Sequence, residues 1–280
     1  MSLLQREVKR WDNGPQMVNG NRTRTVGLMR TVSRALVMST VMCVALTLTS
    51  FAPAAATQAL PDSLTHIENA QQVIVVTAPT WTSTRGTLTA WERTSSGWRE
   101  VVNATPALLG SRGMAPAATR RQATGTTPAG TFAITGAFGR RADPGAQLPY
   151  RQLTTWDAWP YNPTDPSTYN VFQDAKLSWD SYGRNVEHLW DFGMQYDYVA
   201  VLDYNLPQGP VTTDAKGIRR ATQPANTSAG GGIFLHVSNG RTTAGCIAVS
   251  RKVMRTILRW LKPDAHPVIV VGPQDAITQM

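Results

Sequence analysis

Short β-branched or alternating runs, separated by turn residues, restrict the fold of this 280-residue chain more than any other feature. Runs of this kind are typical of strands that are buried on one or both faces. Ser96-Gly97 lies between two of them and predicts a hairpin. The runs predicted to be strands are residues 72–77, 87–93, 98–102, 131–134, 198–204, 232–237 and 266–271.

Residues 251–261 are the one segment after the N-terminal region with the period of an amphipathic helix. Ser250 precedes the segment as a possible N-cap, and Lys262-Pro263 ends it. Its apolar positions lie on one stripe: Val253, Met254, Ile257, Leu258 and Leu261. The sequence therefore predicts a mostly β domain, a β-sandwich or partial barrel, with one C-terminal helix before the last strand.

Residues 139–197 have no sustained period and are rich in Pro, Asp, Trp and Tyr. A stretch of this length in a compact domain is typical of a lid or a binding insertion. Its aromatic side chains could pack on one another, or they could line a substrate groove, where flat rings contact sugars or peptides. On the second interpretation we expect Trp190, together with Tyr204 from the following strand, to contact substrate.

Residues 35–51 form an apolar segment that follows Arg30 and Arg34 and precedes a run of small residues. This order predicts an export signal over residues 1–56, with the mature protein outside the cytoplasm and associated with the cell wall. An uncleaved signal anchor is the alternative, and it would be the only contact with a membrane. The long positive region suggests a true start at Met17 or Met29.

Removal of the predicted signal changes the charge of the protein. Residues 1–56 hold seven of the 27 Lys and Arg and two of the 18 Asp and Glu, so the net charge falls from +9 to +4. No basic cluster interleaved with aromatic residues remains, which argues against nucleic-acid binding. The pairs Arg120-Arg121 and Arg219-Arg220 are expected to be solvated loop residues. The predicted organisation is a linker at 57–70, a catalytic domain at 71–272 and a tail at 273–280.

Cys246 is the only thiol of the mature protein, because the other cysteine, Cys43, lies inside the predicted signal. An exported protein with one cysteine has no internal disulfide, and its thiol calls for a chemical role. His236 ends a predicted strand ten residues earlier. We expect His236 to lower the thiol pKa from its usual value of about 8.5, since the thiolate is the reactive form. Gly245 leaves the adjacent backbone free to approach a developing oxyanion.

The other histidines support different interpretations. His266 follows Cys246 and could serve a peptidase of a different fold with the order Cys then His. His188 lies beside Glu187 and close to Asp191, and could approach the groove from the insertion. The histidines and the thiol have no metal-ligand spacing, so no metal site is expected.

Residues 232–237, the segment Thr243-Ala244-Gly245-Cys246-Ile247, the following helix and the last strand resemble the L,D-transpeptidase (YkuD-type) catalytic domain. That family carries a strand histidine and a Ser-His-Gly-Cys signature. Residues 127–132, Thr-Pro-Ala-Gly-Thr-Phe, also look like the Thr-Pro-x-Gly-x-Phe segment of that domain. The resemblance covers about residues 70 to 272 and is that of an actinobacterial-like variant with Thr-Ala-Gly-Cys.

The resemblance implies roles for the site residues. Cys246 would be the nucleophile, His236 the general base, and the backbone carbonyl of Val237 the group that orients the imidazole. The N–H groups of Gly245 and Cys246 would form the oxyanion hole. The thiolate would attack the third-residue carbonyl of a donor stem tetrapeptide in peptidoglycan, release D-Ala, and pass the acyl group to an acceptor amine. No cofactor is implied, and carbapenems would be covalent inhibitors.

The chain departs from the family pattern at two side chains of the signature. Ala244 replaces the signature histidine, and Ala248 replaces an arginine that is often found two residues after the cysteine. Arg241 and Thr243 are the remaining candidates for substrate contacts near the cysteine. Two alternatives stay open: a hydrolytic L,D-carboxypeptidase, and a catalytically silent module that binds the cell wall through the aromatic insertion.

Overall fold

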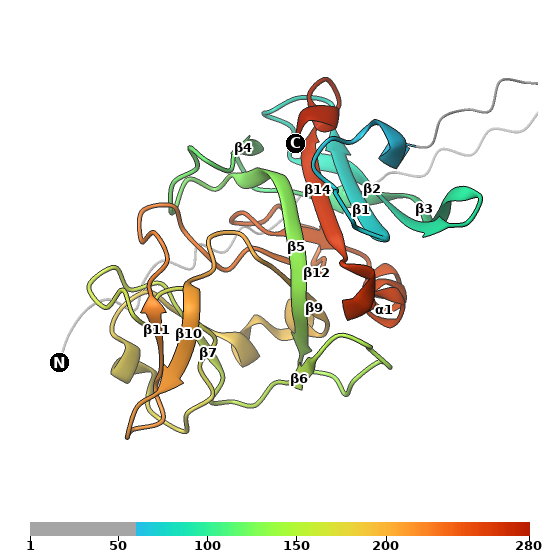
Figure 1. Ribbon diagram of the computed structural model, residues 1–280. Helices are drawn as coiled ribbons and strands as arrows, with labels where there is room; N and C mark the ends of the chain where they lie inside the picture. Colours follow the sequence, from blue (N-terminus) through green and yellow to red (C-terminus); the bar gives the residue numbers. More distant parts are fainter. Residues whose placement is uncertain (1–59) are drawn as a thin grey trace, which may run out of the picture. The chain divides into compact units, whose positions relative to one another are not determined.

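Eight strands hydrogen-bond around a closed ring in this computed structural model, which describes residues 60–280 (Figure 1). The mostly β fold is therefore confirmed, as a closed barrel-like sheet with one helix before the last strand. In ring order the strands are β14 (Val268–Pro273), β1 (Gln72–Ala78), β2 (Arg85–Thr94), β3 (Gly97–Leu108), β13 (Ile247–Val249), β12 (Phe234–Val237), β9 (Val199–Leu202) and β5 (Thr127–Gly139). Pairing of β5 with β14 closes the ring.

The runs predicted from the sequence match seven of these strands, and β13 is the exception. With only three residues, β13 is too short to show a period of its own. Short strands β4 (Met114–Pro116) and β6 (Tyr150–Gln152) extend the sheet along β5. Among the described residues there are also short 3₁₀ turns: Leu60–Ser63, Pro263–Ala265 and Ile277–Gln279.

Helix α1 (Arg251–Trp260) begins and ends close to the predicted residues. The Ser250 hydroxyl accepts a hydrogen bond from the Val253 N–H at 3.3 Å, so Ser250 is the N-cap. The predicted apolar stripe of the helix is buried in the main core through Met254, Ile257 and Leu258. The helix thus connects β13 to β14 while it covers the core.

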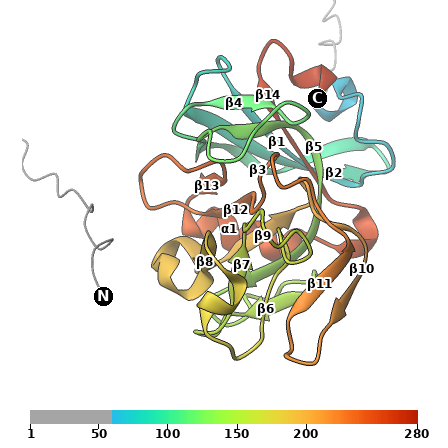
Figure 2. The ribbon, with the colours of Figure 1, turned by 90° about the vertical axis from the view of Figure 1, so that its left-hand side faces the viewer.

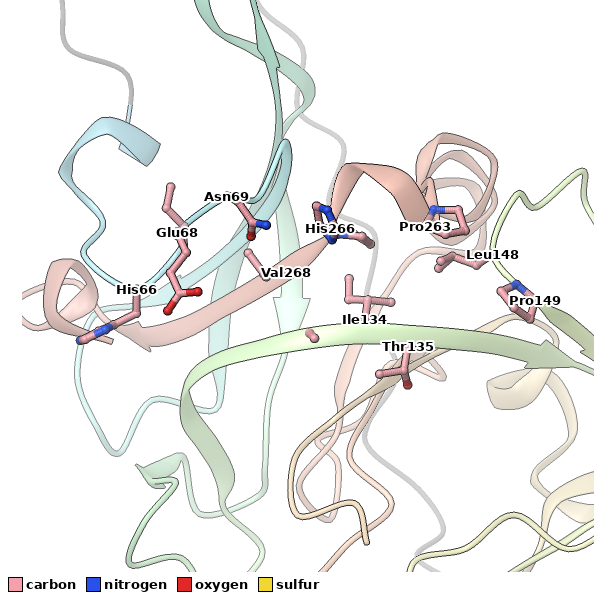
Figure 3. Close-up of a pocket in the computed structure, with 13 residues that line it drawn as sticks. His66, Glu68, Asn69, Ile134, Thr135, Leu148, Pro149, Pro263, His266 and Val268 are labelled. Carbon is pink, nitrogen blue, oxygen red and sulfur yellow. The ribbon is translucent and has the colours of Figure 1, made fainter. Parts of the chain in front are cut away.

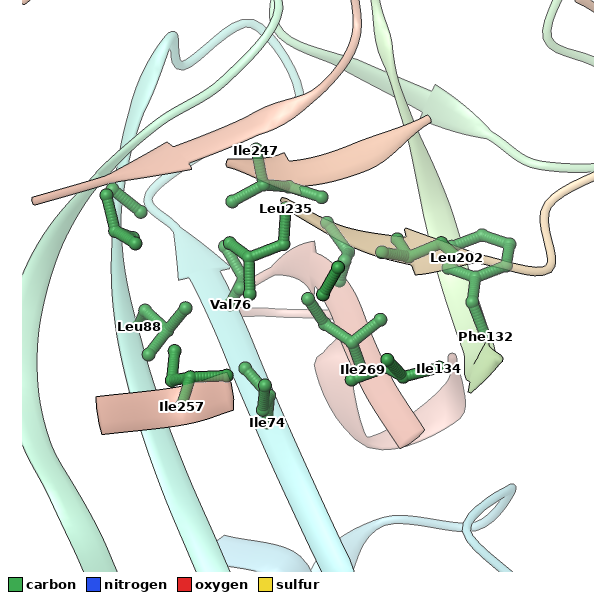
Figure 4. Close-up of a cluster of buried hydrophobic side chains, with 14 of the residues drawn as sticks. Ile74, Val76, Leu88, Phe132, Ile134, Leu202, Leu235, Ile247, Ile257 and Ile269 are labelled. Atoms are coloured by element: carbon green, nitrogen blue, oxygen red, sulfur yellow. The ribbon is translucent and has the colours of Figure 1, made fainter. Parts of the chain in front are cut away.

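The main core lies inside the ring, where aliphatic side chains from β1, β2, β12, β13 and β14 meet α1 (Figure 4). Side chains alternate along β12, as expected for a strand buried on both faces. Ile233, Leu235 and Val237 enter this core. Phe234 belongs to a second cluster on the opposite face. His236, two residues further along, shares the face of Phe234.

Residues 139–197 pack over that opposite face. They contain β7 (Ala158–Pro160), β8 (Val186–His188) and two 3₁₀ helices, η2 (Trp179–Tyr182) and η3 (Leu189–Tyr196). Figure 2 shows β7 and β8 in the lower half of the view, below β1, β2 and β4. The aromatic side chains of the insertion pack on each other and on the barrel strands. Phe234 of β12 makes T-shaped contacts with Trp159 and Tyr196 at centroid distances of 4.9 and 5.9 Å. Most of these aromatic residues are therefore core rather than exposed groove surface.

Strands β10 (Gln208–Thr213) and β11 (Arg219–Gln223) form a separate hairpin beside the insertion. The predicted export signal lies outside the described residues. Within residues 60–280, no helix is long and apolar enough to cross a membrane.

Candidate active site

The pairing of β12 with β13 places His236 and Cys246 on one face of the sheet. The two strands are parallel, with Leu235 opposite Ile247 and His236 opposite Ala248. Leu235 and Ile247 both enter the main core, so their chain neighbours His236 and Cys246 face the other way. Cys246 accordingly packs against the aromatic cluster beneath the insertion.

Thr243 holds the turn that leads to the cysteine. Its hydroxyl donates to the carbonyl oxygen of Cys246 at 2.6 Å and accepts from the N–H of Gly245 at 3.1 Å. Gly245 has a φ of 154°, and a Cβ there would press against the Arg120 guanidinium and the Thr126 carbonyl. Only glycine fits this turn without displacing a neighbour.

The Cys246 thiol is held by the backbone that leads into β12. Its Sγ donates to the carbonyl oxygen of Gly232 at 3.2 Å. Burial and the nearby Glu187 carboxylate raise the pKa of Cys246 to about 12, while the Phe234 N–H and the Arg120 charge act in the opposite direction. The expected lowering of the thiol pKa is therefore not found: in this state the cysteine is a neutral thiol.

His236 is 4% exposed, and its Nδ1 lies 2.9 Å from the Val237 carbonyl oxygen. A carbonyl can only accept, so Nδ1 carries the hydrogen and Nε2 is the basic nitrogen. Burial lowers the pKa of His236 to about 4, although the Val237 carbonyl favours the charged ring. Its ring meets Tyr196 edge to face at a centroid distance of 5.6 Å. The imidazole is thus neutral and orientated as a proton acceptor.

Cys246 opens into a pocket of about 360 Å³. The insertion supplies one wall, residues before β12 a second, and the loop after β4 a third. His236 is not among the lining residues. The lining residues are Arg120, Gln122, Ala123, Tyr161, Asn185, Val186, Glu187, Gly231, Gly232, Ile233, Ala244, Gly245 and Cys246.

Arg120 is a buried residue of this pocket, which corrects the expectation of a solvated loop arginine. Its side chain is almost fully enclosed, at 4% exposure. Nε donates to the Thr126 carbonyl at 3.0 Å and Nη1 to the Ala229 carbonyl at 2.9 Å. Neutral carbonyls are its partners, and within the described residues no carboxylate pairs with it. The pocket therefore has an uncompensated positive charge close to Gly245.

Glu187 brings a negative charge to the same pocket. It lies on β8, opposite Trp159 of β7. The Tyr196 hydroxyl donates to its Oε2 at 2.8 Å. Tyr161 faces the same carboxylate, but its buried hydroxyl makes no hydrogen bond of normal geometry. Burial raises the pKa of Glu187 to about 7, against the lowering effect of the two tyrosines.

Sequence reasoning missed both charged residues of the pocket. Arg120 lies far along the chain from Cys246, and nothing in its local sequence marks it as buried. Glu187 was noted only as a neighbour of His188. The presence of a single acidic residue among the aromatic residues of 182–190 was the available signal.

The four residues nominated as substrate contacts lie elsewhere or are already engaged. Arg241 is exposed outside the pocket. Trp190 packs under the Arg140 guanidinium, and the Tyr204 hydroxyl donates to the Ala229 carbonyl at 2.9 Å beneath Arg120. Thr243 uses its hydroxyl within the cysteine turn.

The two other histidines of interest are away from the thiol. His266 lines a different pocket of about 450 Å³, together with His66 and Glu68, and that pocket shares no residue with the pocket of Cys246 (Figure 3). His188 stacks on Trp179 at 3.4 Å and lies 3.6 Å from Asp191. The geometry therefore gives no support to a pair of Cys246 and His266. Residues 60–280 contain no group of acidic, His and Cys side chains that could hold a metal ion.

Comparison with known proteins identifies the family. A family model described as the L,D-transpeptidase catalytic domain (YkuD) matches residues 71–270. No curated protein and no solved structure matches the chain. The matched region contains the closed ring, α1, Cys246 and His236. The chain belongs to the L,D-transpeptidase catalytic domain family, whose members act on peptidoglycan stem peptides.

Proposed function

We propose that this protein is an exported peptidoglycan L,D-transpeptidase whose nucleophile is Cys246. One observation carries the proposal: the register of β12 and β13 places a fixed thiol and a neutral, orientated imidazole on the same face of the sheet. The Thr-Ala-Gly-Cys segment is then a variant of the family signature. In it, Thr243 fixes the turn through its hydroxyl, and Ala244 has no part in the chemistry.

The first chemical step is formation of the thiolate. With the thiol pKa raised and the histidine pKa lowered, the resting pair is uncharged. Nε2 of His236 accepts the thiol proton as the sulfur attacks the third-residue carbonyl of the donor stem. Displacement of water by the donor strengthens the contacts that favour the anion. These contacts are the Phe234 N–H and the Arg120 charge.

The developing oxyanion needs donors on the side of the turn. We assign this role to the N–H groups of Gly245 and Cys246. The Arg120 guanidinium lies close to Gly245 and lines the same pocket. A buried cation beside an oxyanion is effective because little water screens it. Arg120 therefore supplies from another segment the positive charge that is absent at Ala248. Proton transfer from His236 then expels D-Ala, and an acceptor amine resolves the thioester.

The adduct experiment tests the nucleophile. Purified protein is incubated with a carbapenem and its mass is measured. We expect one covalent adduct on Cys246, no adduct with Cys246→Ala, and strongly slowed formation with His236→Ala. Folded wild-type protein that remains unmodified would contradict the proposal.

Product analysis separates this function from its two alternatives. Incubation with disaccharide tetrapeptide is expected to yield crosslinked dimers and free D-Ala. Tripeptide without dimers would identify an L,D-carboxypeptidase. Unchanged tetrapeptide, with binding to sacculi that survives Cys246→Ala, would identify a wall-binding module. Fractionation of cells would test export, since the proposal places the mature protein at the cell wall.

A further inference from the structure

Glu187 is a half-buried pocket residue whose charge has no partner within the described part of the chain. It forms none of the ion pairs found in residues 60–280, and its one hydrogen bond of normal geometry comes from the neutral Tyr196 hydroxyl. A carboxylate can accept about four hydrogen bonds. Even partial burial of an ionised carboxylate with so few donors is unfavourable unless a further donor or cation reaches it.

The surroundings of Glu187 show where that partner would come from. Tyr161 and Tyr196 flank the carboxylate, and Cys246 is close enough for the charges of Glu187 and the thiolate to oppose each other. Tyr161 also lines the pocket, and its hydroxyl faces the Glu187 carboxylate without a hydrogen bond of normal geometry. The Glu187 carboxylate therefore has unused acceptor capacity in the pocket that Cys246 lines.

Two sides of the pocket carry opposite charges. Arg120 lies on the side of Gly245, and Glu187 on the side of the insertion, with Cys246 lining the same pocket. An acyl group on the sulfur would direct its oxygen toward the positive side, because that oxygen gains negative charge during attack. The nucleophile that resolves the thioester then approaches with the negative side nearest to it.

We propose that Glu187 binds the ammonium group of the acceptor stem and removes a proton from it before attack on the Cys246 thioester. This inference rests on the proposed acyl-transfer function and assigns the acceptor side of the same pocket. His236 does not line the pocket, so the two residues divide the reaction: His236 serves acylation and Glu187 serves transfer. The preferred acceptor is a primary amine that arrives as a cation.

The step balances in atoms and charge. The Glu187 carboxylate takes one proton from the ammonium and becomes a carboxylic acid. The free amine attacks the thioester carbonyl, the C–S bond breaks, and the remaining proton lost by nitrogen protonates the thiolate. An amide, a neutral thiol and a protonated Glu187 result, and Glu187 returns its proton to solvent. A pKa of about 7 suits this cycle, because both forms of the carboxyl are populated near neutral pH.

The test uses the full chain with disaccharide tetrapeptide as donor and acceptor. D-Ala release and the ratio of dimer to tripeptide are measured between pH 5.5 and 9. For the wild type we expect the ratio to rise through about pH 7 and then to level off. Glu187→Gln should retain D-Ala release within a few-fold and lower the ratio by about a hundredfold near pH 7. Its ratio should continue to rise at high pH, as the amine loses its own proton.

Asp191→Asn is the matched control, because Asp191 lies on the same segment and its side chain is 60% exposed. Its ratio and pH profile should equal those of the wild type. A Glu187→Gln protein with the wild-type ratio and the same level region above pH 7 overturns the inference. So does a wild-type ratio that rises without levelling off, even if Glu187→Gln fails to fold. Absence of any Cys246 adduct and of D-Ala release would instead refute the proposed function.

Discussion

The thiol of Cys246 donates a hydrogen bond to the backbone carbonyl of Gly232 at 3.2 Å. This contact depends on an unusual backbone, because Gly232 has a φ of 61° and lies directly under the Tyr161 hydroxyl. The position of the nucleophile is therefore set by the segment before β12 as much as by its own loop.

Gly232→Ala is expected to destabilise the protein and to displace the thiol. The new Cβ would overlap the Tyr161 hydroxyl, and alanine at positive φ is strained in addition. Together these effects should lower the free energy of unfolding by about 2–5 kcal/mol. Denaturant unfolding measures the loss, and the rate of carbapenem adduct formation reports the displacement.

Gly240→Ala separates the cost of backbone strain at positive φ from the cost of overlap with the Tyr161 hydroxyl. Gly240 also has a positive φ, of 84°, but nothing lies within 4 Å of a Cβ there. Gly240→Ala should therefore lower the free energy of unfolding by only about 1–2 kcal/mol. Equal losses in the two variants would show that Tyr161 does not constrain Gly232.

The charges of Arg120 and Glu187 should change thiol reactivity in opposite directions. Glu187 disfavours the Cys246 thiolate and Arg120 favours it. At pH 8 we expect Glu187→Gln to alkylate with iodoacetamide about three- to tenfold faster than the wild type, and Arg120→Gln slower by a similar factor. Arg121→Gln is the control, since Arg121 is exposed beside Arg120. A change of the same sign in both pocket variants would contradict the assigned electrostatics.

The sequence was sufficient to predict the fold class, seven of the ring strands and the helix, because these elements have clear local signals. The β-branched runs at residues 72–77 and 266–271 correspond to β1 and β14 in the structure. The apolar stripe ending at Leu261 corresponds to α1, with Ser250 as its N-cap. Closure of the ring was not predictable in this way. It depends on pairing between β5 and β14, which lie far apart in the chain and have no local signal for each other.

The site was predictable only in part, for a related physical reason. Cys246 and His236 were nominated because they lie close together in the sequence, and strand alternation then places them on one face. Arg120 and Glu187 reach the pocket through tertiary packing of distant segments. The direction of the pKa shifts also depends on burial beneath the insertion, which a single sequence does not reveal.

Thr243→Val should loosen the cysteine turn without removing the thiol itself. The threonine hydroxyl joins the Gly245 N–H to the Cys246 carbonyl, and valine has nearly the same shape without the hydroxyl. Loss of both hydrogen bonds should cost about 1–3 kcal/mol of unfolding free energy and slow adduct formation. Thr242→Val, at an exposed neighbouring position, should change neither quantity. Unaltered adduct formation in Thr243→Val would argue against a positioning role.

His236 should make folding stability fall in acid. Burial lowers the pKa of His236 to about 4 from 6.5, so the unfolded chain binds the proton more tightly than the folded chain. The stabilisation is therefore fully present above about pH 6.5 and is lost as the pH falls through 4, with a total of about 3 kcal/mol. Glu187 contributes in the opposite sense, because a raised carboxyl pKa favours the folded state at low pH and this contribution is lost as the pH rises through about 7.

Unfolding by denaturant from pH 4 to 8 should accordingly show a steeper loss of stability in acid for Glu187→Gln than for the wild type. The loss should be shallower for His236→Gln, which lacks the titrating ring. If His236→Gln shows the same acid dependence as the wild type, His236 does not titrate as a buried neutral imidazole, and its assignment as the resting proton acceptor fails with it.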